Sequence, residues 1–383
     1  MPIYQVHGQL PPKHYTLMRG PLGSYCHEEL LTNEGFDGEY SLLYRLRAPT
    51  SMLRSEQLPP LPDDRTDTAL DNYLFQMGDV TGSGDLLSAR RTWFEGANIS
   101  FDIAKPDRAG EGFTRNAWSD ELVVITEGTG VLRSPMGDLP YKPLDLVLVP
   151  RSLTVQWVPD DVPHTMAVVE STSPITIPPS FRNPRTGQFY AWTPYKERDL
   201  RLPQFRDPID ETGEFPITVK YGRNLSRFWL DHHPFDVVGW DGYLYPFALN
   251  LDDYEPITGR IEKLPDQYLV FTTLGTLMMA VVPRRRPDHP DAIPAQPHHM
   301  NTDIDEILFR IGGTNRLTDP GGGTITLHPR GLSHGPRPGF LDQPKTEMLP
   351  LYAFMLDTRD HLTITNAARR HMDPNNARNY RPS

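Results

Sequence analysis

The sequence predicts an all-β protein with few short helices. Proline and glycine are unusually frequent, with 40 and 29 copies among 383 residues, and both interrupt helices and favour short strands joined by turns. Segments rich in Val, Ile, Leu, Thr and Phe recur at short intervals and end at Gly, Pro, Asn or Asp. No sustained amphipathic helical pattern competes with them. The expected strands include residues 121–126, 144–149, 165–169, 268–273, 276–282, 307–311, 323–327 and 352–356.

The chain is long enough for two domains of ordinary size. Residues 118–164 and 298–334 share one layout of strand, Gly-containing turn, strand and Pro-rich corner ending in His, which indicates a weak internal duplication. Residues 178–210 are dense in Pro, Arg and Asp, a composition typical of an ordered connection between lobes. We place the division near residue 230, which gives lobes at 1–229 and 230–383.

Charge and cysteine content exclude several partners and compartments. The 38 basic and 49 acidic side chains give a net charge of -11, which repels phosphate backbones, so we expect no nucleic-acid partner. The one cysteine, Cys26, cannot form an internal disulfide. The first 15 residues carry no apolar stretch typical of a signal peptide, and the longest uncharged apolar run, residues 268–282, is too short to cross a membrane as a helix of about 20 residues. We therefore expect a cytoplasmic protein with no membrane partner.

The histidines are unevenly distributed, and their clustering is the main functional signal. Fe(II) and similar metals bind neutral imidazoles together with a hard carboxylate, and a set of two His and one carboxylate leaves coordination positions open for substrate and O2. Three such side chains can face one barrel interior. They would be a His at the start of a strand, a carboxylate further along that strand, and a second His on a neighbouring strand. The candidates within 37 residues are His298, His299, His328 and His334, with Asp303, Asp305 and Glu306.

Strand parity limits the choice among these residues, because side chains on one face of a strand differ by even offsets. His298 lies eight residues before Glu306 and satisfies parity alone. His299 lies seven residues before Glu306, so it would have to sit in a turn or beyond a bulge near residues 301–303. The residues alone leave both histidines open. Any single one of these histidines could instead be a loop residue bonded to backbone, but the set as a whole favours a metal.

Two of these segments carry a family resemblance. Residues 297–306, PHHMNTDIDE, and residues 326–336, TLHPRGLSHGP, resemble the iron-binding segments of the homogentisate 1,2-dioxygenase family. Similarity extends to residues 35–50 and 235–246, and in weaker form to nearly the whole chain. The resemblance implies a bicupin of two jelly-roll β-sandwich lobes, mononuclear Fe(II) in the C-terminal lobe, and O2-dependent opening of a hydroquinone-type ring.

The resemblance also assigns roles to individual residues. His299, followed by x-Asn as in the family, and Glu306 match the first two iron ligands, and His334 matches the third. His298 is thereby set aside. His328 matches a family histidine that borders the substrate and helps to hold the incoming phenol and oxygen. The N-terminal lobe has no comparable ligand cluster in its sequence, so we expect it to be structural and without metal.

One departure from the family pattern concerns the substrate. The homogentisate enzymes proper of this family carry a histidine in a Trp-His-Gly string, where this chain has Trp240, Asp241 and Gly242. Asp241 could accept a proton from a metal-bound phenol, or it could be an ordinary turn residue before a glycine; both interpretations stay open. The spacing from the first His to Glu is one residue longer than in the family and the chain is shorter. Both facts suggest a paralogue acting on a related aromatic compound.

Further substrate contacts and partners follow from this hypothesis. Arg330 is the first candidate to clamp a substrate carboxylate by a bidentate contact. Trp240, Tyr243 and Tyr245 are candidate aromatic walls of the site, with core packing as the alternative. The expected partners are a small aromatic substrate and O2, and the resemblance implies a homo-oligomer, a trimer or hexamer.

Two other functions compete with the ring-cleaving dioxygenase. A non-oxygenase cupin, an isomerase or a hydrolase, could use Zn, Mn or Ni with the same three ligands. A non-catalytic structural bicupin would bind no stoichiometric metal.

Overall fold

The computed structural model describes residues 3–32, 39–61, 64–66, 69–77, 80, 82–160, 163–261, 263, 268–290, 292, 299–313, 323–335 and 347–374. His298, residues 35–36 of the family-like segment 35–50, and residues 321–322 of the repeated layout at 298–334 lie outside this set. The regular secondary structure of the described residues is almost entirely strand, as the frequent Pro and Gly and the β-branched runs predict. Helix within them is confined to three 3-10 turns and α1, at Pro179–Phe181, Glu197–Asp199, Leu251–Asp253 and Asn366–Arg369. The predicted all-β fold class with few short helices is confirmed, and each predicted strand overlaps an observed one.

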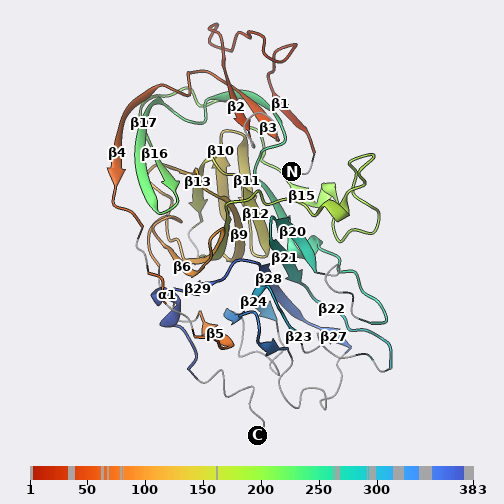
Figure 1. The fold of residues 1–383 in the computed structure, drawn as a ribbon. Coiled ribbons are helices and arrows are strands. Elements are labelled where there is room, and N and C mark those ends of the chain that lie inside the picture. Colours follow the sequence, from red (N-terminus) through yellow and green to blue (C-terminus); the bar gives the residue numbers. More distant parts are fainter. Residues whose placement is uncertain are drawn as a thin grey trace.

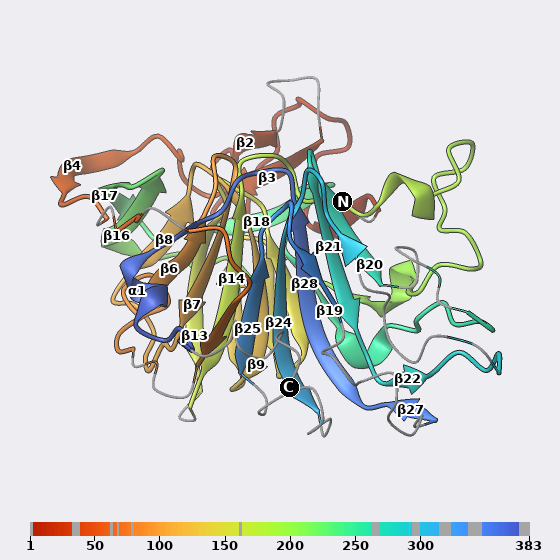
Figure 2. The same ribbon diagram turned by 60° about the horizontal axis from the view of Figure 1, so that its bottom comes forward.

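Within the described residues the strands form four larger sheets and two short ribbons (Figures 1 and 2). A four-stranded sheet near the N-terminus has the order β1 (Gln5–Gly8), β18 (Val237–Gly242), β3 (Tyr40–Arg45) and β2 (His27–Thr32). A seven-stranded sheet has the order β11 (Gly137–Tyr141), β10 (Gly130–Ser134), β13 (Thr154–Pro159), β8 (Phe113–Asn116), β16 (Thr212–Tyr221), β17 (Asn224–His232) and β4 (Met52–Leu58).

The other two larger sheets make up the centre and the C-terminal side of the molecule. The eight-stranded sheet has the order β15 (Leu200–Arg201), β19 (Phe247–Asn250), β12 (Asp145–Val149), β9 (Asp120–Glu127), β14 (Thr165–Ser171), β7 (Ile99–Ala104), β6 (Arg90–Glu95) and β29 (Thr363–Ile364). The six-stranded sheet has the order β20 (Leu269–Thr273), β21 (Thr276–Val281), β28 (Leu351–Thr358), β24 (Asp305–Gly313), β25 (Thr324–His328) and β5 (Tyr73–Gln76). The ribbons pair β22 (Arg284–Arg285) with β27 (Met348–Leu349), and β23 (His299–Met300) with β26 (Ser333–His334).

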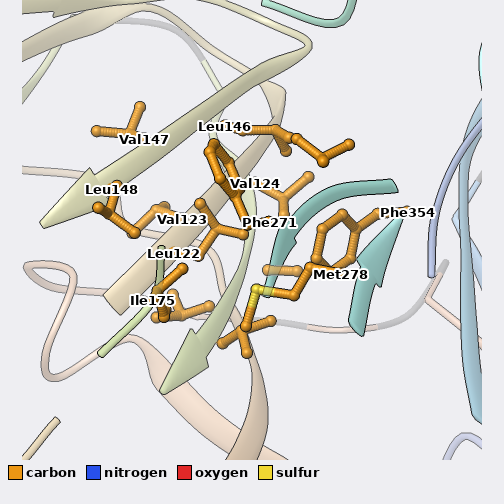
Figure 3. Packing of buried hydrophobic residues seen from close by; sticks show 14 of the residues in the cluster. Leu122, Val123, Val124, Leu146, Val147, Leu148, Ile175, Phe271, Met278 and Phe354 are labelled. Atoms are coloured by element: carbon orange, nitrogen blue, oxygen red, sulfur yellow. The ribbon is translucent and has the colours of Figure 1, made fainter. Parts of the chain in front are cut away.

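The eight-stranded sheet packs on a different sheet through each face. Phe101 in β7 packs edge-to-face on Phe309 in β24, with ring centroids 5.9 Å apart, and so joins the eight- and six-stranded sheets. Figure 3 shows Leu122 and Val124 of β9 in the same apolar cluster as Phe271 and Met278 of the six-stranded sheet. Burial of these side chains supplies the main stabilising term, at roughly 25 cal/mol for each Å² of apolar surface.

A buried ionic network lies on the opposite face, which looks toward the seven-stranded sheet. Arg90 in β6 pairs with Asp102 in β7, Glu121 in β9 and Glu170 in β14, and Lys220 of β16 also pairs with Glu170. Asp102 follows Phe101 directly along the strand, and successive strand side chains point to opposite faces. One face of the sheet therefore carries the apolar junction and the other the charged one.

The division expected near residue 230 does not coincide with a boundary between sheets. β18 and β19 follow residue 230 but pair with β1, β3 and β12 of the N-terminal half. Conversely, β5 from the N-terminal half forms the edge of the six-stranded sheet next to β25. The C-terminal β29 pairs in turn with β6. The two halves of the chain thus exchange strands, and β5 brings N-terminal residues to the end of β25.

In the part of the chain that the structure describes, no helix has the length and apolar character that spanning a membrane requires.

Candidate metal centre

Two short strands bring the first and third predicted ligands side by side. β23 pairs antiparallel with β26, and His299 lies directly opposite His334 in the register. β23 ends at Met300 and β24 begins at Asp305, so residues 301–304 interrupt the strand. This break removes the parity conflict of the odd offset between His299 and Glu306, because alternation of faces applies only within one regular strand.

The three candidate ligands converge on one point. Nε2 of His334 lies 3.2 Å from Oε2 of Glu306, and Nε2 of His299 lies 3.5 Å from the same oxygen. All three ligand atoms lie within 4.8 Å of one another. The side chains of His334 and Glu306 are 2% and 5% exposed, whereas that of His299 is 34% exposed. The site is therefore open on the side of His299.

Hydrogen bonds hold these side chains in a state that suits metal binding. Nδ1 of His334 lies 3.1 Å from the carbonyl oxygen of Leu332, which can only accept, so Nδ1 carries the proton and Nε2 carries the lone pair. The amide of Asn301 donates to Oε2 of Glu306 at 3.4 Å. Burial opposes ionisation of Glu306, but the favourable interactions of its carboxylate with the neighbouring imidazoles of His299 and His334 outweigh it and hold its pKa well below the usual range. Two imidazole nitrogens and one ionised carboxylate fit a mononuclear divalent metal such as Fe(II).

His328 lies beside this cluster without belonging to it. It is opposite Glu306 in the β24–β25 register, and its ring stacks on that of His334 with centroids 4.4 Å apart and an interplanar angle of 3°. Its Nδ1 lies 2.9 Å from Oδ1 of Asn72. Burial, reinforced by the neighbouring His334, lowers the pKa of His328 to about 3, although Glu306 acts against this shift. The imidazole is therefore neutral at physiological pH.

Asp357 on β28 is a neighbour that the sequence analysis missed. It lies opposite Glu306 in the β24–β28 register, so His328, Glu306 and Asp357 form a row across three adjacent strands and share one face. Burial, with repulsion from Glu306, raises the pKa of Asp357 to about 8. Its buried Oδ1 has no hydrogen-bond partner within the residues that the structure describes. No motif surrounds Asp357, and only the strand register reveals its position.

Arg330 is engaged in contacts that compete with the predicted role as a substrate clamp. Its Nε and its backbone N–H donate to Oδ1 of Asp305 at 2.9 and 3.0 Å. Its guanidinium also donates to the carbonyl oxygens of Arg359 and Asp360 at 3.0 and 2.8 Å. Asp305 is 1% exposed, so the carboxylate that Arg330 binds is one of the protein's own. This geometry assigns Arg330 to holding the loop between β25 and β26.

The other predicted site residues lie in β18 of the four-stranded sheet or directly after it, away from the candidate ligands. β1 and β3, the neighbours of β18, lie at the top of Figure 1, and β23 and β24 lie at the bottom. Asp241 is 1% exposed and binds the hydroxyl of Tyr4 and, at 2.8 Å, Nε2 of His14. Within one chain the structure does not bring Asp241 to the metal cluster.

The three aromatic residues near Asp241 pack in the same region. Trp240 is fully buried and donates from Nε1 to the carbonyl oxygen of Met136 at 3.0 Å. Tyr245 is also fully buried, and its hydroxyl donates to the carbonyl oxygen of Ile3 at 2.6 Å. Tyr243 is 39% exposed and packs edge-to-face on Tyr4. For Trp240 and Tyr245 the structure favours the core-packing alternative over walls of the metal site.

Two imidazoles and one carboxylate that converge at a strand end of a β-sandwich are typical of the class of proteins with mononuclear, open metal sites. The family model described as homogentisate 1,2-dioxygenase N-terminal matches residues 49–251 of this chain. A provisionally named dioxygenase of Saccharolobus solfataricus is 31% identical over 382 residues, covering 98% of this chain and 98% of that protein. The chain belongs to the homogentisate 1,2-dioxygenase family.

More distant relatives agree with this assignment. The homogentisate 1,2-dioxygenase of Emericella nidulans is 25% identical, over 86% of this chain and 79% of that protein. That of Rhodopseudomonas palustris is 27% identical, over 66% of this chain and 58% of that protein, so this match spans less than two thirds of the relative. Among solved structures, a mutant of Bacillus subtilis oxalate decarboxylase is 12% identical with a TM-score of 0.34, covering 80% of this chain and 82% of that one. This structural likeness is weak, and the family assignment rests on the sequence matches.

Proposed function

We propose that this protein is a ring-cleaving dioxygenase that holds Fe(II) on His299, Glu306 and His334. Its substrate would be a hydroquinone-type or related dihydroxylated aromatic compound, similar to homogentisate, and its second substrate O2. The observation that carries the proposal is the convergence of the three donor atoms within 4.8 Å in a member of this family. The remoteness of Asp241 from the cluster within one chain leaves its predicted role as a base without support here.

The donor set fits ferrous iron because it combines two neutral nitrogens with one hard anionic oxygen and leaves several coordination positions free. When bound, Fe(II) would supply a Lewis acid that lowers the pKa of a coordinated phenol, and the redox chemistry with O2. Glu306 contributes one negative charge, since its carboxyl group is held in the ionised form. The hydrogen bond from Asn301 limits rotation of that carboxylate.

The chain's own residues then account for proton movement and for control of water. His328 is neutral and stacks on the ligand His334, so it is placed to exchange a proton with a substrate hydroxyl near the metal. The burial of Glu306, His328 and His334 keeps water from most of the site. His299, the more exposed ligand, marks the side on which a small aromatic molecule would enter.

Metal binding tests the first half of the proposal. We expect anaerobically reconstituted protein to hold about one Fe(II) per chain. The variants Glu306→Gln and His334→Ala should lose the metal, whereas the control His27→Ala, an exposed histidine on β2, should keep it. Protein that takes up no transition metal would contradict the proposal and favour a structural, non-catalytic role.

Oxygen consumption tests the second half. An oxygen electrode would record O2 uptake by the Fe(II)-loaded protein with hydroquinones, catechols, gentisate, homogentisate and aminophenols. Uptake that depends on Fe(II) and on one class of aromatic compound supports ring cleavage. Stoichiometric metal without O2 uptake, combined with turnover supported by Zn, Mn or Ni, would favour the isomerase or hydrolase alternative. Light scattering would check the trimer or hexamer that the family implies.

A further inference from the structure

Asn72 contacts the candidate site from a distant part of the sequence. It immediately precedes β5, the N-terminal strand that forms the edge of the six-stranded sheet next to β25. Its Oδ1 lies 2.9 Å from Nδ1 of His328, a residue 256 positions away. Its Nδ2 donates to the carbonyl oxygen of Ser333, adjacent to the ligand His334, at 3.3 Å.

These two contacts fix the orientation of the Asn72 amide. The carbonyl oxygen of Ser333 can only accept a hydrogen bond, so the NH2 group of Asn72 must face it. The amide oxygen then faces His328, and this oxygen is also only an acceptor. Nδ1 of His328 must therefore carry a hydrogen, and in the neutral ring Nε2 must carry the lone pair.

We propose that Asn72 is a positioning residue that sets the tautomer and the ring orientation of His328, so that Nε2 acts as the proton acceptor beside the metal ligands. This inference rests on the proposed function for its catalytic meaning, but the hydrogen-bond geometry itself does not depend on turnover. The same amide ties His328 to the backbone before His334. Asn72, from the N-terminal half of the chain, thus links the imidazole of His328 to β26, the strand that carries His334.

The decisive measurement is the protonation pattern of the His328 ring in the full-length chain, with and without Zn(II) as a diamagnetic metal. Nitrogen-15 NMR of histidine-labelled protein distinguishes a protonated ring nitrogen from one with a lone pair, and His328→Gln identifies the signals. We expect the proton on Nδ1 in the wild type and in Asn72→Asp, which keeps an acceptor. In Asn72→Leu and Asn72→Ala the proton should move at least partly to Nε2. The control Gln76→Leu, an exposed residue of β5, should behave as the wild type.

Turnover provides an independent readout. If the protein is the proposed dioxygenase, Asn72→Leu should lower kcat by on the order of tenfold, as is typical when the partner of an active-site imidazole is lost, with unchanged metal content. Asn72→Asp should recover part of this loss. An unchanged tautomer in both Asn72→Leu and Asn72→Ala would overturn the inference. A changed tautomer in a protein that turns over none of the aromatics would leave Asn72 as the positioning residue and would instead refute the proposed function.

Discussion

Replacing Arg330 by methionine distinguishes a structural from a substrate-binding role for this residue. The side chain donates to Asp305, which is almost fully buried and directly precedes the candidate ligand Glu306. Methionine keeps the apolar stem of arginine but removes the charge and the donors. We expect Arg330→Met to destabilise the fold and to reduce metal retention, because the loop that leads to His334 loses its anchor.

The magnitude follows from the contacts. A hydrogen bond between charged groups contributes about 1.5–3 kcal/mol, and each bond from the guanidinium to a carbonyl oxygen contributes about 1 kcal/mol. Water can replace part of this, since Arg330 is 33% exposed. The backbone N–H of Leu362 also donates to Asp305, at 2.8 Å, and this bond does not involve Arg330. We therefore expect a loss of about 2–3 kcal/mol in the free energy of unfolding.

Urea denaturation of a double-mutant cycle measures this coupling. The cycle comprises Arg330→Met, Asp305→Asn and the double variant, and residues in direct contact should show a coupling energy of about 1.5 kcal/mol or more. The KM values for a carboxylated aromatic and its carboxylate-free analogue are measured in parallel and should change together. A stability loss below about 0.5 kcal/mol, with a rise in KM only for the carboxylated compound, would refute this reasoning. That result would support Arg330 as a residue that binds a substrate carboxylate.

Three further predictions concern pH, backbone conformation and metal removal. Burial and the charge of Arg206 lower the pKa of His233 to about 4. Between about pH 6.5 and pH 4 the unfolded chain therefore binds more protons than the native one. The free energy of unfolding should fall as the pH decreases through this window. The contribution should be about 1–2 kcal/mol after discounting for the half-exposed ring, and urea titrations at pH 7 and 5 should show a smaller pH effect in His233→Gln. Gly242 has φ +136°, and an added Cβ would overlap the carbonyl oxygen of Tyr40, so Gly242→Ala should cost more than about 2 kcal/mol in thermal unfolding. A chelator should lower the Tm by several degrees, because a metal at a thousand times its Kd stabilises by about 4 kcal/mol, and Glu306→Gln should not respond.

The sequence predicts the strands well because their signals are local. Residues 307–311 and 352–356, for example, are short β-branched and aromatic runs, and they fall within β24 and β28. The exchange of strands between the halves could not be predicted in this way. β5 and β29 contain four and two residues, which is too few to show the alternation of apolar and polar residues that predicts a strand. Their pairing is determined by the sheet edge against which each of them lies.

The candidate ligands were predictable as a set because they lie in two short motifs. Parity alone favoured His298, and the break between β23 and β24 explains how His299 reaches Glu306 instead. The contact between Arg330 and Asp305 could not be predicted from the sequence, because the two residues lie 25 positions apart and only the fold brings them together. Asn72 carries no local signal, since its role depends on strand pairing across most of the chain.

The strand exchange also has a consequence for what a single cut in the backbone would do. β5 from the N-terminal half is the edge strand of the six-stranded sheet, and β29 from the C-terminal half is the edge strand of the eight-stranded sheet. Each half of the chain therefore contributes a strand to a sheet of the other half. A protease that cleaves the exposed connection around residue 185 should therefore yield two fragments that remain associated and elute together in size-exclusion chromatography. Neither fragment, when expressed alone, should fold to the native state.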